Sequence, residues 1–211
     1  MVRFVTFEGG DGTGKTTQIN ALENYLTRHG RVPLVTREPG GTSLGRLIRR
    51  LLVEVGDQDI ASSTELFLYL ADRAQHVSEI IRPAITGGKI VLCDRFTDST
   101  LAYQGYGRGI ELGLLRRLNE IADQGTRPDL TFLLDCPVAL GLSRTSKRQG
   151  DAGQPREDRF EREKIEFHEK IRSGFLEIAR AEPTRFRVID AARGIDEVWR
   201  DIQQIADQEI L

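Results

Sequence analysis

The residues with the most distinctive chemistry form a glycine-rich stretch near the amino terminus. Positions 9–16 read Gly-Gly-Asp-Gly-Thr-Gly-Lys-Thr and fit the pattern G-x-x-x-x-G-K-[ST], after an apolar run and before a segment of helical period. Glycines let successive backbone N–H groups point at a phosphate, Lys15 adds a positive charge, and the hydroxyl of Thr16 suits Mg²⁺. A turn that only connects a strand to a helix is the alternative, and the match of every fixed position and both flanks speaks against it. The predicted nucleoside triphosphate site comprises Gly9, Gly10, Asp11, Gly12, Thr13, Gly14, Lys15, Thr16 and Thr17.

Two charged residues, Asp94 and Arg95, directly follow the apolar run 90–93. If that run is a strand of a parallel sheet, both side chains lie at its carboxyl end, beside the glycine-rich loop. A carboxylate there can hold Mg²⁺ through its water shell, and an arginine fork can bind a phosphate through two parallel hydrogen bonds. A salt bridge that caps the strand is the alternative interpretation.

Short apolar runs rich in β-branched and aromatic residues alternate with longer segments of helical period. The expected strands are 3–7, 32–36, 90–93, 130–134 and 186–189. The expected helices are 15–29, 43–55, 63–86, 112–124, 138–147, 159–181 and 195–208, with a mobile polar stretch at 148–158. Parallel neighbours need crossover connections that lay helices on the sheet, so this order predicts an α/β fold with a five-stranded parallel sheet flanked by helices.

The composition is that of an ordinary globular protein. With 211 residues, 39% of them hydrophobic, and a formal net charge of -2, we expect one domain over residues 1–211 and no nucleic-acid partner. No run approaches the length of a membrane span, and the first residues lack a signal-peptide pattern. Cys93 and Cys136 lie in apolar runs, which indicates a reduced, cytoplasmic setting.

The use of the bound triphosphate is a separate question, because GTPases and ATP-driven machines share this loop. A GTPase normally has Asn-Lys-x-Asp for the base, whereas Asn20, Asn24 and Asn119 precede Ala, Tyr and Glu. The chain is also small for a motor ATPase. A small-molecule kinase fits these observations better.

Four stretches in register resemble the bacterial thymidylate kinases, and the resemblance runs over nearly the whole chain. They are FEGGDGTGKTT at 7–17, REPGGT at 37–42, ADRAQH at 71–76, and DRF at 94–96 with STLAYQG at 99–105. The resemblance implies the three-layer P-loop NTPase fold with a mobile lid at about 144–160. It also implies ATP-dependent phosphorylation of dTMP to dTDP in dTTP biosynthesis, with Mg²⁺, by a homodimer.

The resemblance assigns roles in the phosphate-transfer centre. Asp11 contacts the 3′-hydroxyl of the acceptor, which would explain a carboxylate inside an anion-binding loop. Arg95 binds the acceptor phosphate, while Asp94 and Thr16 hold Mg²⁺. Positions 10–13 contain no basic residue, so the resemblance implies that the cation for the transferring group comes from the lid.

The lid is basic, and a solvated charged face remains the better interpretation for most of its cations. Our hypothesis is that Arg148 contacts the transferring group and that Arg144 lies near the adenine and phosphates. The basic residues considered are Arg144, Lys147, Arg148, Arg156, Arg159 and Arg162. The catalytic set is therefore Lys15, Asp11, Arg95, Asp94 and Arg148.

The resemblance also implies a base pocket. Arg73 contacts a thymine carbonyl, Tyr69 stacks on the base where many relatives have Phe, and Tyr103 crowds the 2′-position of the sugar. Phe67, two residues before Tyr69, is expected to pack within the helical layer. The Glu38–Pro39 bond is expected to be cis, as in relatives. The full acceptor set is Asp11, Arg37, Glu38, Pro39, Tyr69, Arg73, Arg95, Ser99, Thr100, Tyr103 and Gln104.

Two alternatives remain at this point: another P-loop kinase for a deoxynucleoside or nucleoside monophosphate, and a nucleotide switch with no small acceptor. Acceptor-dependent ADP release separates them. The kinase interpretation requires Lys15 and Arg95 to face one cleft, because the donor phosphates and the acceptor phosphate must meet in line.

Overall fold

The structure, a computed structural model, describes residues 2–53, 60–152, 160 and 163–211, with the backbone alone for residues 148–152. Its centre is a five-stranded sheet of order β2-β3-β1-β4-β5, in which every neighbouring pair is parallel. The strands are β1 (Phe4–Glu8), β2 (Leu34–Arg37), β3 (Val91–Asp94), β4 (Leu130–Asp135) and β5 (Phe186–Asp190). Each begins and ends within two residues of its predicted range, so the predicted α/β fold is confirmed.

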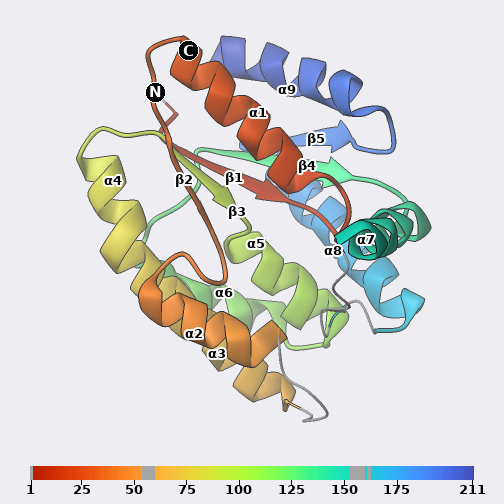
Figure 1. Ribbon diagram of the computed structural model, residues 1–211. Coiled ribbons are helices and arrows are strands. Elements are labelled where there is room, and N and C mark those ends of the chain that lie inside the picture. Colours follow the sequence, from red (N-terminus) through yellow and green to blue (C-terminus); the bar gives the residue numbers. More distant parts are fainter. Residues whose placement is uncertain (1, 54–59, 153–159, 161–162) are drawn as a thin grey trace.

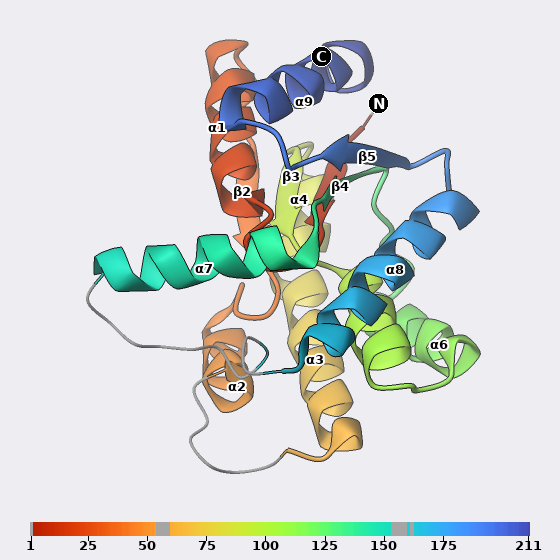
Figure 2. The same cartoon turned by 90° about the vertical axis from the view of Figure 1, so that its right-hand side faces the viewer.

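Helices cover both faces of this sheet (Figure 1). On one face, α1 (Lys15–Arg28) and α9 (Ile195–Glu209) bury Leu22, Leu26 and Ile202 against the strands. The opposite face carries α3 (Ser62–His76), α4 (Arg82–Thr86), α6 (Leu112–Asp123) and α8 (Ile165–Ala181), as the turned view shows (Figure 2). One apolar cluster on the first face and two on the opposite face therefore hold the carboxyl edge of the sheet in a fixed shape.

The register of the strands brings the charged strand ends together. Phe7 of β1 lies beside Asp94 of β3, and Arg37 of β2 also lies beside Asp94. The loop after β1 and the residue Arg95 after β3 therefore leave the sheet at the same level. This placement follows from parallel pairing, because parallel strands end at one edge.

Two predicted helix boundaries near the lid are wrong. The helix α7 (Val138–Ala152) runs past residue 147, so the first five residues of the stretch predicted to be a mobile loop are helical. The helix predicted at 159–181 begins only at Ile165, and Phe160 lies in a turn. The ring of Phe160 is buried against Tyr103 and Phe167, and this tertiary contact outweighs the local helical period. Residues 153–158 of that stretch lie outside the described part of the chain.

Other helices differ from expectation in their detail. The predicted helix 63–86 is present, with a wide π-type turn η1 (Val77–Ile81) between α3 and α4. The helix α2 (Ser43–Val53) begins where predicted, and residues 54–59 beyond it are not described. Helical residues at α5 (Thr97–Thr100) and η2 (Leu101–Gly107) were not predicted. Wide helical turns of this kind often mark functional sites.

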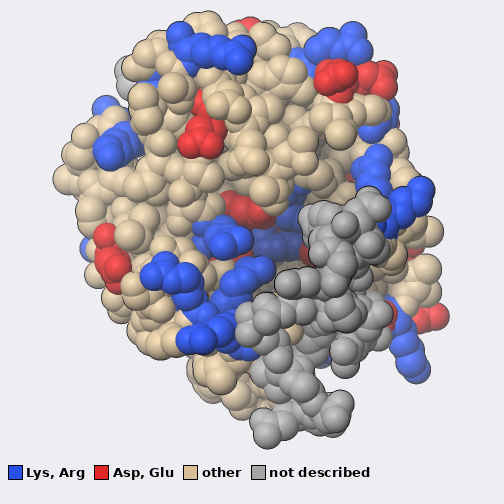
Figure 3. Space-filling model, viewed as in Figure 1, with Lys and Arg blue, Asp and Glu red and all other residues tan. Residues whose placement is uncertain are grey.

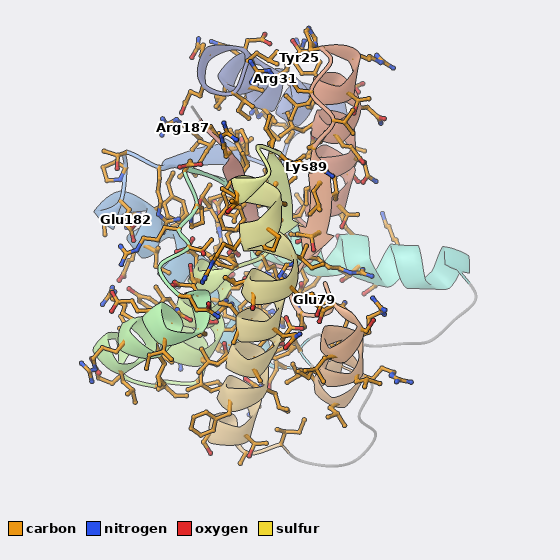
Figure 4. The ribbon with its side chains drawn as sticks, turned by 90° about the vertical axis from the view of Figure 1, so that its left-hand side faces the viewer. Tyr25, Arg31, Glu79, Lys89, Glu182 and Arg187 are labelled. Atoms are coloured by element: carbon orange, nitrogen blue, oxygen red, sulfur yellow. The ribbon has the colours of Figure 1, made fainter. Side chains whose placement is uncertain are left out.

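The amino ends of the strands lie at the pole opposite to the charged strand ends. Arg31 and Lys89 occupy the turns that lead into β2 and β3 there (Figure 4). Among the described residues, no helix has the length and apolar content that crossing a bilayer would need. Cys93 on β3 and Cys136 after β4 are buried and unpaired, in agreement with their apolar sequence context.

Candidate functional site

The glycine-rich loop joins β1 to α1 at the carboxyl edge of the sheet. Gly9, Gly12 and Gly14 have φ angles of 133°, 71° and 92°, in the region that favours glycine. A Cβ at Gly12 would lie 2.0 Å from the carbonyl oxygen of Gly141, so α7 rests directly on the loop. Because α1 begins at Lys15, the loop presents the free N–H groups of a helix amino terminus to the cleft.

Lys15 lies inside this loop and is only 8% exposed. Its ammonium donates to the carbonyl oxygens of Gly9 (3.0 Å) and Gly10 (2.8 Å). Burial, together with the like charge of Arg95, lowers the pKa of Lys15 to about 8, although nearby carboxylates oppose this shift. An anionic phosphate would stabilise the charged form, so the pocket is electrostatically matched to a triphosphate.

Thr16 and Asp94 stand side by side in the same cleft. The Thr16 hydroxyl donates to the Asp94 carboxylate at 3.2 Å. One carboxylate and one hydroxyl beside phosphates is the donor set that Mg²⁺ commonly takes in kinases. Within the described ranges, no group of three or more His, Cys, Asp or Glu side chains could hold a metal. The two oxygen donors fit Mg²⁺, and the phosphates would complete its shell.

Arg95 faces the loop from the end of β3. Its φ angle of 68° lies in the left-handed region, which is uncommon for a residue other than glycine. The guanidinium donates to Gly9 O at 2.9 Å and to the Asp11 carboxylate at 2.6 Å, and it stacks 5.1 Å from the ring centroid of Tyr103. Lys15 also donates to Gly9 O, so the two cations share one carbonyl oxygen as acceptor. Both side chains line the same cavity. This confirms the arrangement that the kinase interpretation requires.

Asp11 is the only acidic residue within the loop, and its carboxylate forms an ion pair with Arg95. Burial raises its pKa, but the charges of Arg95, Lys15 and His168 outweigh burial and bring the pKa below its ordinary value. The Tyr103 hydroxyl lies 3.4 Å from its second oxygen. Asp11 therefore presents an ionised acceptor to the cleft, which suits a sugar hydroxyl.

A cavity opens beside Arg95, at the end of β3. It brings together every predicted acceptor residue except Arg37. The predicted residues that line it are Asp11, Glu38, Pro39, Tyr69, Arg73, Arg95, Ser99, Thr100, Tyr103 and Gln104. The Glu38–Pro39 bond is cis, as expected. Segments far apart in the sequence, the end of β2, α3, and the α5–η2 segment, thus meet in one pocket.

Arg37 lies in the neighbouring, strongly charged part of the cleft. It lines a cavity with Lys15, Arg49 and Arg95 that also contains Thr16, Thr17 and Asp94. Figure 3 shows Lys and Arg side chains gathered in and beside a hollow at the middle of this face, close to α2. The hollow joins the phosphate loop to the acceptor cavity and is suited to several phosphate groups in a row.

The structure adds residues that the sequence argument missed. Phe160 and Arg49 line the acceptor cavity, and Glu8 accepts hydrogen bonds from Phe96 N and the Ser99 hydroxyl in the segment beside it. Phe160 carried a signal, since it is the single aromatic residue in a long polar stretch. Nothing in the sequence distinguishes Arg49 from the other arginines of α2. The exposed ring of Phe67, at 61%, shows that the expected packing of this residue within the chain is wrong.

The predicted lid residues are only partly described. Arg144 donates to the carbonyl oxygens of Ala191 (2.8 Å) and Ala192 (3.3 Å), in the loop after β5. The backbone of Arg148 continues α7, but its side chain lies outside the described part, as do Arg156, Arg159 and Arg162. Their assigned roles stay predictions.

Glu8, at the end of β1, is a buried acid that holds the segment after Arg95. Its two oxygens accept from Phe96 N (2.7 Å) and from the Ser99 hydroxyl (2.6 Å). Burial, reinforced by the charge of Asp98, raises the pKa of Glu8 to about 7. Between pH 4.5 and about 7 the folded protein therefore binds more protons than the unfolded chain, and this group makes stability fall as pH rises.

We expect Glu8→Gln to remove that slope, because the amide has the same shape and does not titrate. The unfolding free energy of the unmodified protein, relative to Glu8→Gln, should fall by up to about 3 kcal/mol between pH 5 and pH 8. Urea unfolding at both pH values measures it, with Glu169→Gln as a control at an exposed carboxylate. Parallel pH profiles for the two proteins would contradict the raised pKa.

Comparison with known proteins gives a consistent result. A thymidylate kinase family model matches residues 7–202. A thymidylate kinase from Desulfovibrio desulfuricans is 55% identical over 196 residues, which cover 92% of this chain and 90% of that protein. One from Geobacter sulfurreducens is 52% identical, covering 93% and 92%. The crystal structure of thymidylate kinase from Ehrlichia chaffeensis superposes with a TM-score of 0.78 at 37% identity, covering 97% and 98%.

Proposed function

The chain belongs to the thymidylate kinase family and phosphorylates dTMP to dTDP with ATP, and from that premise we propose how its residues divide this work. The observation that carries the proposal is the shared contact of Lys15 and Arg95 with the Gly9 carbonyl oxygen. Two phosphate-binding cations at one point allow a donor and an acceptor phosphate to meet in line. This activity excludes the two alternatives, which were a P-loop kinase for a deoxynucleoside or another nucleoside monophosphate and a nucleotide switch.

On the donor side, residues 9–17 wrap the phosphates of ATP. The backbone N–H groups of the loop and the helix amino terminus bind the phosphate oxygens, and the Lys15 ammonium offsets negative charge on the β- and γ-phosphates. Thr16 and Asp94 would hold Mg²⁺, which neutralises charge on the phosphates when bound. The support is their adjacency in the cleft beside the loop.

On the acceptor side, Arg95 and Ser99 hold the phosphate of dTMP, and Asp11 accepts from the 3′-hydroxyl. Arg37 reaches toward the phosphates from the charged part of the cleft. In the base pocket, Tyr69 stacks on thymine while Arg73, Thr100 and Gln104 face its polar edge, and Tyr103 fills the space beside the 2′-position. Glu38 and Pro39 form the wall opposite, and the lining of one cavity by all of these residues except Arg37 supports the set.

The remaining cation for the transferring group comes from the lid, about 144–160, and we assign it to Arg148. Positions 10–13 supply no basic residue, and α7, which carries Arg148, rests on the loop at Gly12. Arg144 belongs to the ATP site, where it fixes the loop after β5. Lid, sheet and helices act as one domain over residues 1–211, and closure of the lid would exclude water from the transfer.

The chain works as a homodimer in the cytoplasm. Large apolar side chains stand exposed on α2 and α3, namely Leu44, Leu47, Leu51 and Phe67. The three leucines follow helical spacing along one face, and α2 packs beside α3 (Figure 1), so a second copy could cover a continuous apolar surface. The two buried, unpaired cysteines suit a reducing compartment.

A panel of acceptors tests the assignment. With ATP and Mg²⁺ held constant, we expect ADP release with dTMP, none with thymidine, which lacks a phosphate for Arg95, and a rate with dCMP lower by at least about tenfold. The dCMP result follows because the Arg73 donors require a carbonyl and cytosine offers an amino group at that position. Activity with thymidine but not with dTMP would overturn the roles proposed for the acceptor cavity.

A further inference from the structure

His76 is a fully buried imidazole whose role the phosphate chemistry leaves open. It lies on α3, three residues after Arg73 and therefore on the same face of the helix, and its exposure is 0%. Its Nδ1 lies 2.9 Å from Glu38 Oε1, and its Nε2 lies 2.6 Å from the Thr36 hydroxyl. An ionised carboxylate can only accept, so Nδ1 donates to Glu38, while Nε2 and the Thr36 hydroxyl share the second hydrogen bond.

The Glu38 carboxylate bridges His76 and Arg73. Its second oxygen, Oε2, accepts from Arg73 Nε at 2.9 Å, and the residue is 4% exposed. Each carboxylate oxygen therefore has its own partner on α3, one from His76 and one from Arg73. With both ends held, the carboxylate plane of Glu38 cannot rotate without leaving a buried polar group unpaired, which is costly.

Arg73 is itself held on all sides and reaches the acceptor cavity. Its Nη1 donates to Thr100 Oγ1 (2.8 Å) and Asn119 Oδ1 (2.7 Å), and its Nη2 donates to Phe96 O (2.9 Å). The Nε contact to Glu38 is the one that holds the guanidinium from the side of β2. The residue is 2% exposed and still lines the cavity.

The backbone around Glu38 is fitted to the imidazole. A Cβ at Gly41 would lie 2.4 Å from His76 Nε2, so the loop after Pro39 packs directly on the ring. One turn earlier on α3, Asp72 accepts from Gly40 N at 3.0 Å. Three residues of α3 thus hold residues 38–41, and His76 is the one that bridges Thr36 and Glu38.

We propose that His76 is a positioning residue for base selectivity: through Glu38 it sets the plane of Arg73, and with it the preference for a pyrimidine that has a carbonyl at position 4 over one with an amino group. The proposal rests on the role of Arg73 proposed above. The contacts of Arg73 to Glu38, Thr100, Asn119 and Phe96 use four of its five N–H groups and leave one Nη2–H for a carbonyl. A guanidinium held in one plane presents this N–H to a carbonyl and rejects an amino group, whereas a tilted one leaves room for a bridging water and discriminates less.

A matched pair of amide variants tests which ring nitrogen matters. His76→Asn places an amide near the Nδ1 position and can keep the bond to Glu38, while His76→Gln reaches the Nε2 position and keeps only the contact to Thr36. Both insert one neutral amide at the same buried site, so their effects on stability should be similar. Steady-state kinetics with dTMP and dCMP, KM for ATP and urea unfolding are measured for both.

We expect His76→Gln to raise KM for dTMP and to lower the dTMP-to-dCMP ratio of kcat/KM by about tenfold, with KM for ATP unchanged. His76→Asn should retain most of the ratio, and Thr36→Val should leave it intact. Equal ratios in His76→Gln and His76→Asn would overturn the proposal, because a merely structural histidine moves stability and not selectivity.

Arg73→Gln, measured in parallel, separates this inference from the function it rests on. If Arg73→Gln leaves the ratio unchanged, the proposed thymine contact of Arg73 fails, and the inference about His76 fails with it. If Arg73→Gln lowers the ratio while His76→Gln does not, only the inference about His76 is overturned. A fall in the ratio with both variants supports the whole chain of contacts.

Discussion

Replacing Arg95 with Ala is expected to lower kcat/KM for dTMP by about a thousandfold, because two charge-assisted hydrogen bonds of about 1.5–3 kcal/mol each are lost. The change also removes the partner that Asp11 holds at 2.6 Å, and an unpaired carboxylate would then repel the acceptor phosphate. ATP affinity should change far less, because Lys15 and the loop amides remain. Kinetics with varied dTMP at saturating ATP, together with calorimetric ATP binding, measure the two effects separately.

Two further arginine variants sharpen this result. Arg95→Lys keeps the charge but loses the planar fork, so we expect it to recover only a small part of the activity. Arg127→Ala removes an arginine that is paired with Glu120 on the surface and should leave the kinetics intact. A large loss of ATP affinity in Arg95→Ala, with dTMP binding preserved, would place Arg95 on the donor side and contradict the proposed division.

Replacing Lys15 with Met should have an effect at least as large, but on the donor side. Removal of a single neutral donor from a transition-state site costs about 100- to 1,000-fold, and Lys15 contributes a full charge in a buried position. We expect kcat to fall by about a thousandfold or more and ATP binding to weaken, while folding is retained. In the unmodified protein, burial lowers the pKa of the Lys15 ammonium to about 8. Methionine therefore also removes the free-energy cost of burying a charge, which favours folding.

Two control variants test whether the charge of Lys15 or its position in the loop matters. Lys15→Arg keeps the charge, but its larger planar group does not match two carbonyl oxygens at 2.8 and 3.0 Å, so little activity should return. Lys89→Met removes an exposed lysine at the opposite pole of the sheet (Figure 4) and should behave like the unmodified protein. Full activity in Lys15→Met would exclude the loop lysine from phosphoryl transfer.

The sequence by itself determined the sheet, most helices and the phosphate loop. The strands β1 to β5 follow short apolar runs, and α1 and α9 follow helical periods, because both signals depend on neighbours in the chain. The loop was readable because glycine, lysine and threonine at fixed spacing each have a separate physical task. Asp94 and Arg95 were placed correctly since parallel strands must end at one edge.

The acceptor site could not be predicted from local sequence patterns, and the roles of its residues came from a family resemblance. Only the tertiary structure decided that Arg37 lines the charged part of the cleft and that Phe160 closes the base cavity. It also decided the helical residues 97–107 and the late start of α8. The base cavity and the late start of α8 depend on contacts between residues far apart in the sequence, such as Phe160 with Tyr103, which no local period encodes.

His76 illustrates the same division. In the sequence it is the last residue of the ADRAQH stretch at 71–76, but nothing there indicates what its ring contacts. Its role comes from Thr36 in β2 and Glu38 directly after β2, which contact the two ring nitrogens from forty and thirty-eight positions away. Local chemistry can be read along a chain, but the partner of a buried polar group is chosen by packing in three dimensions, because the strands and helices must be assembled before its hydrogen bonds exist.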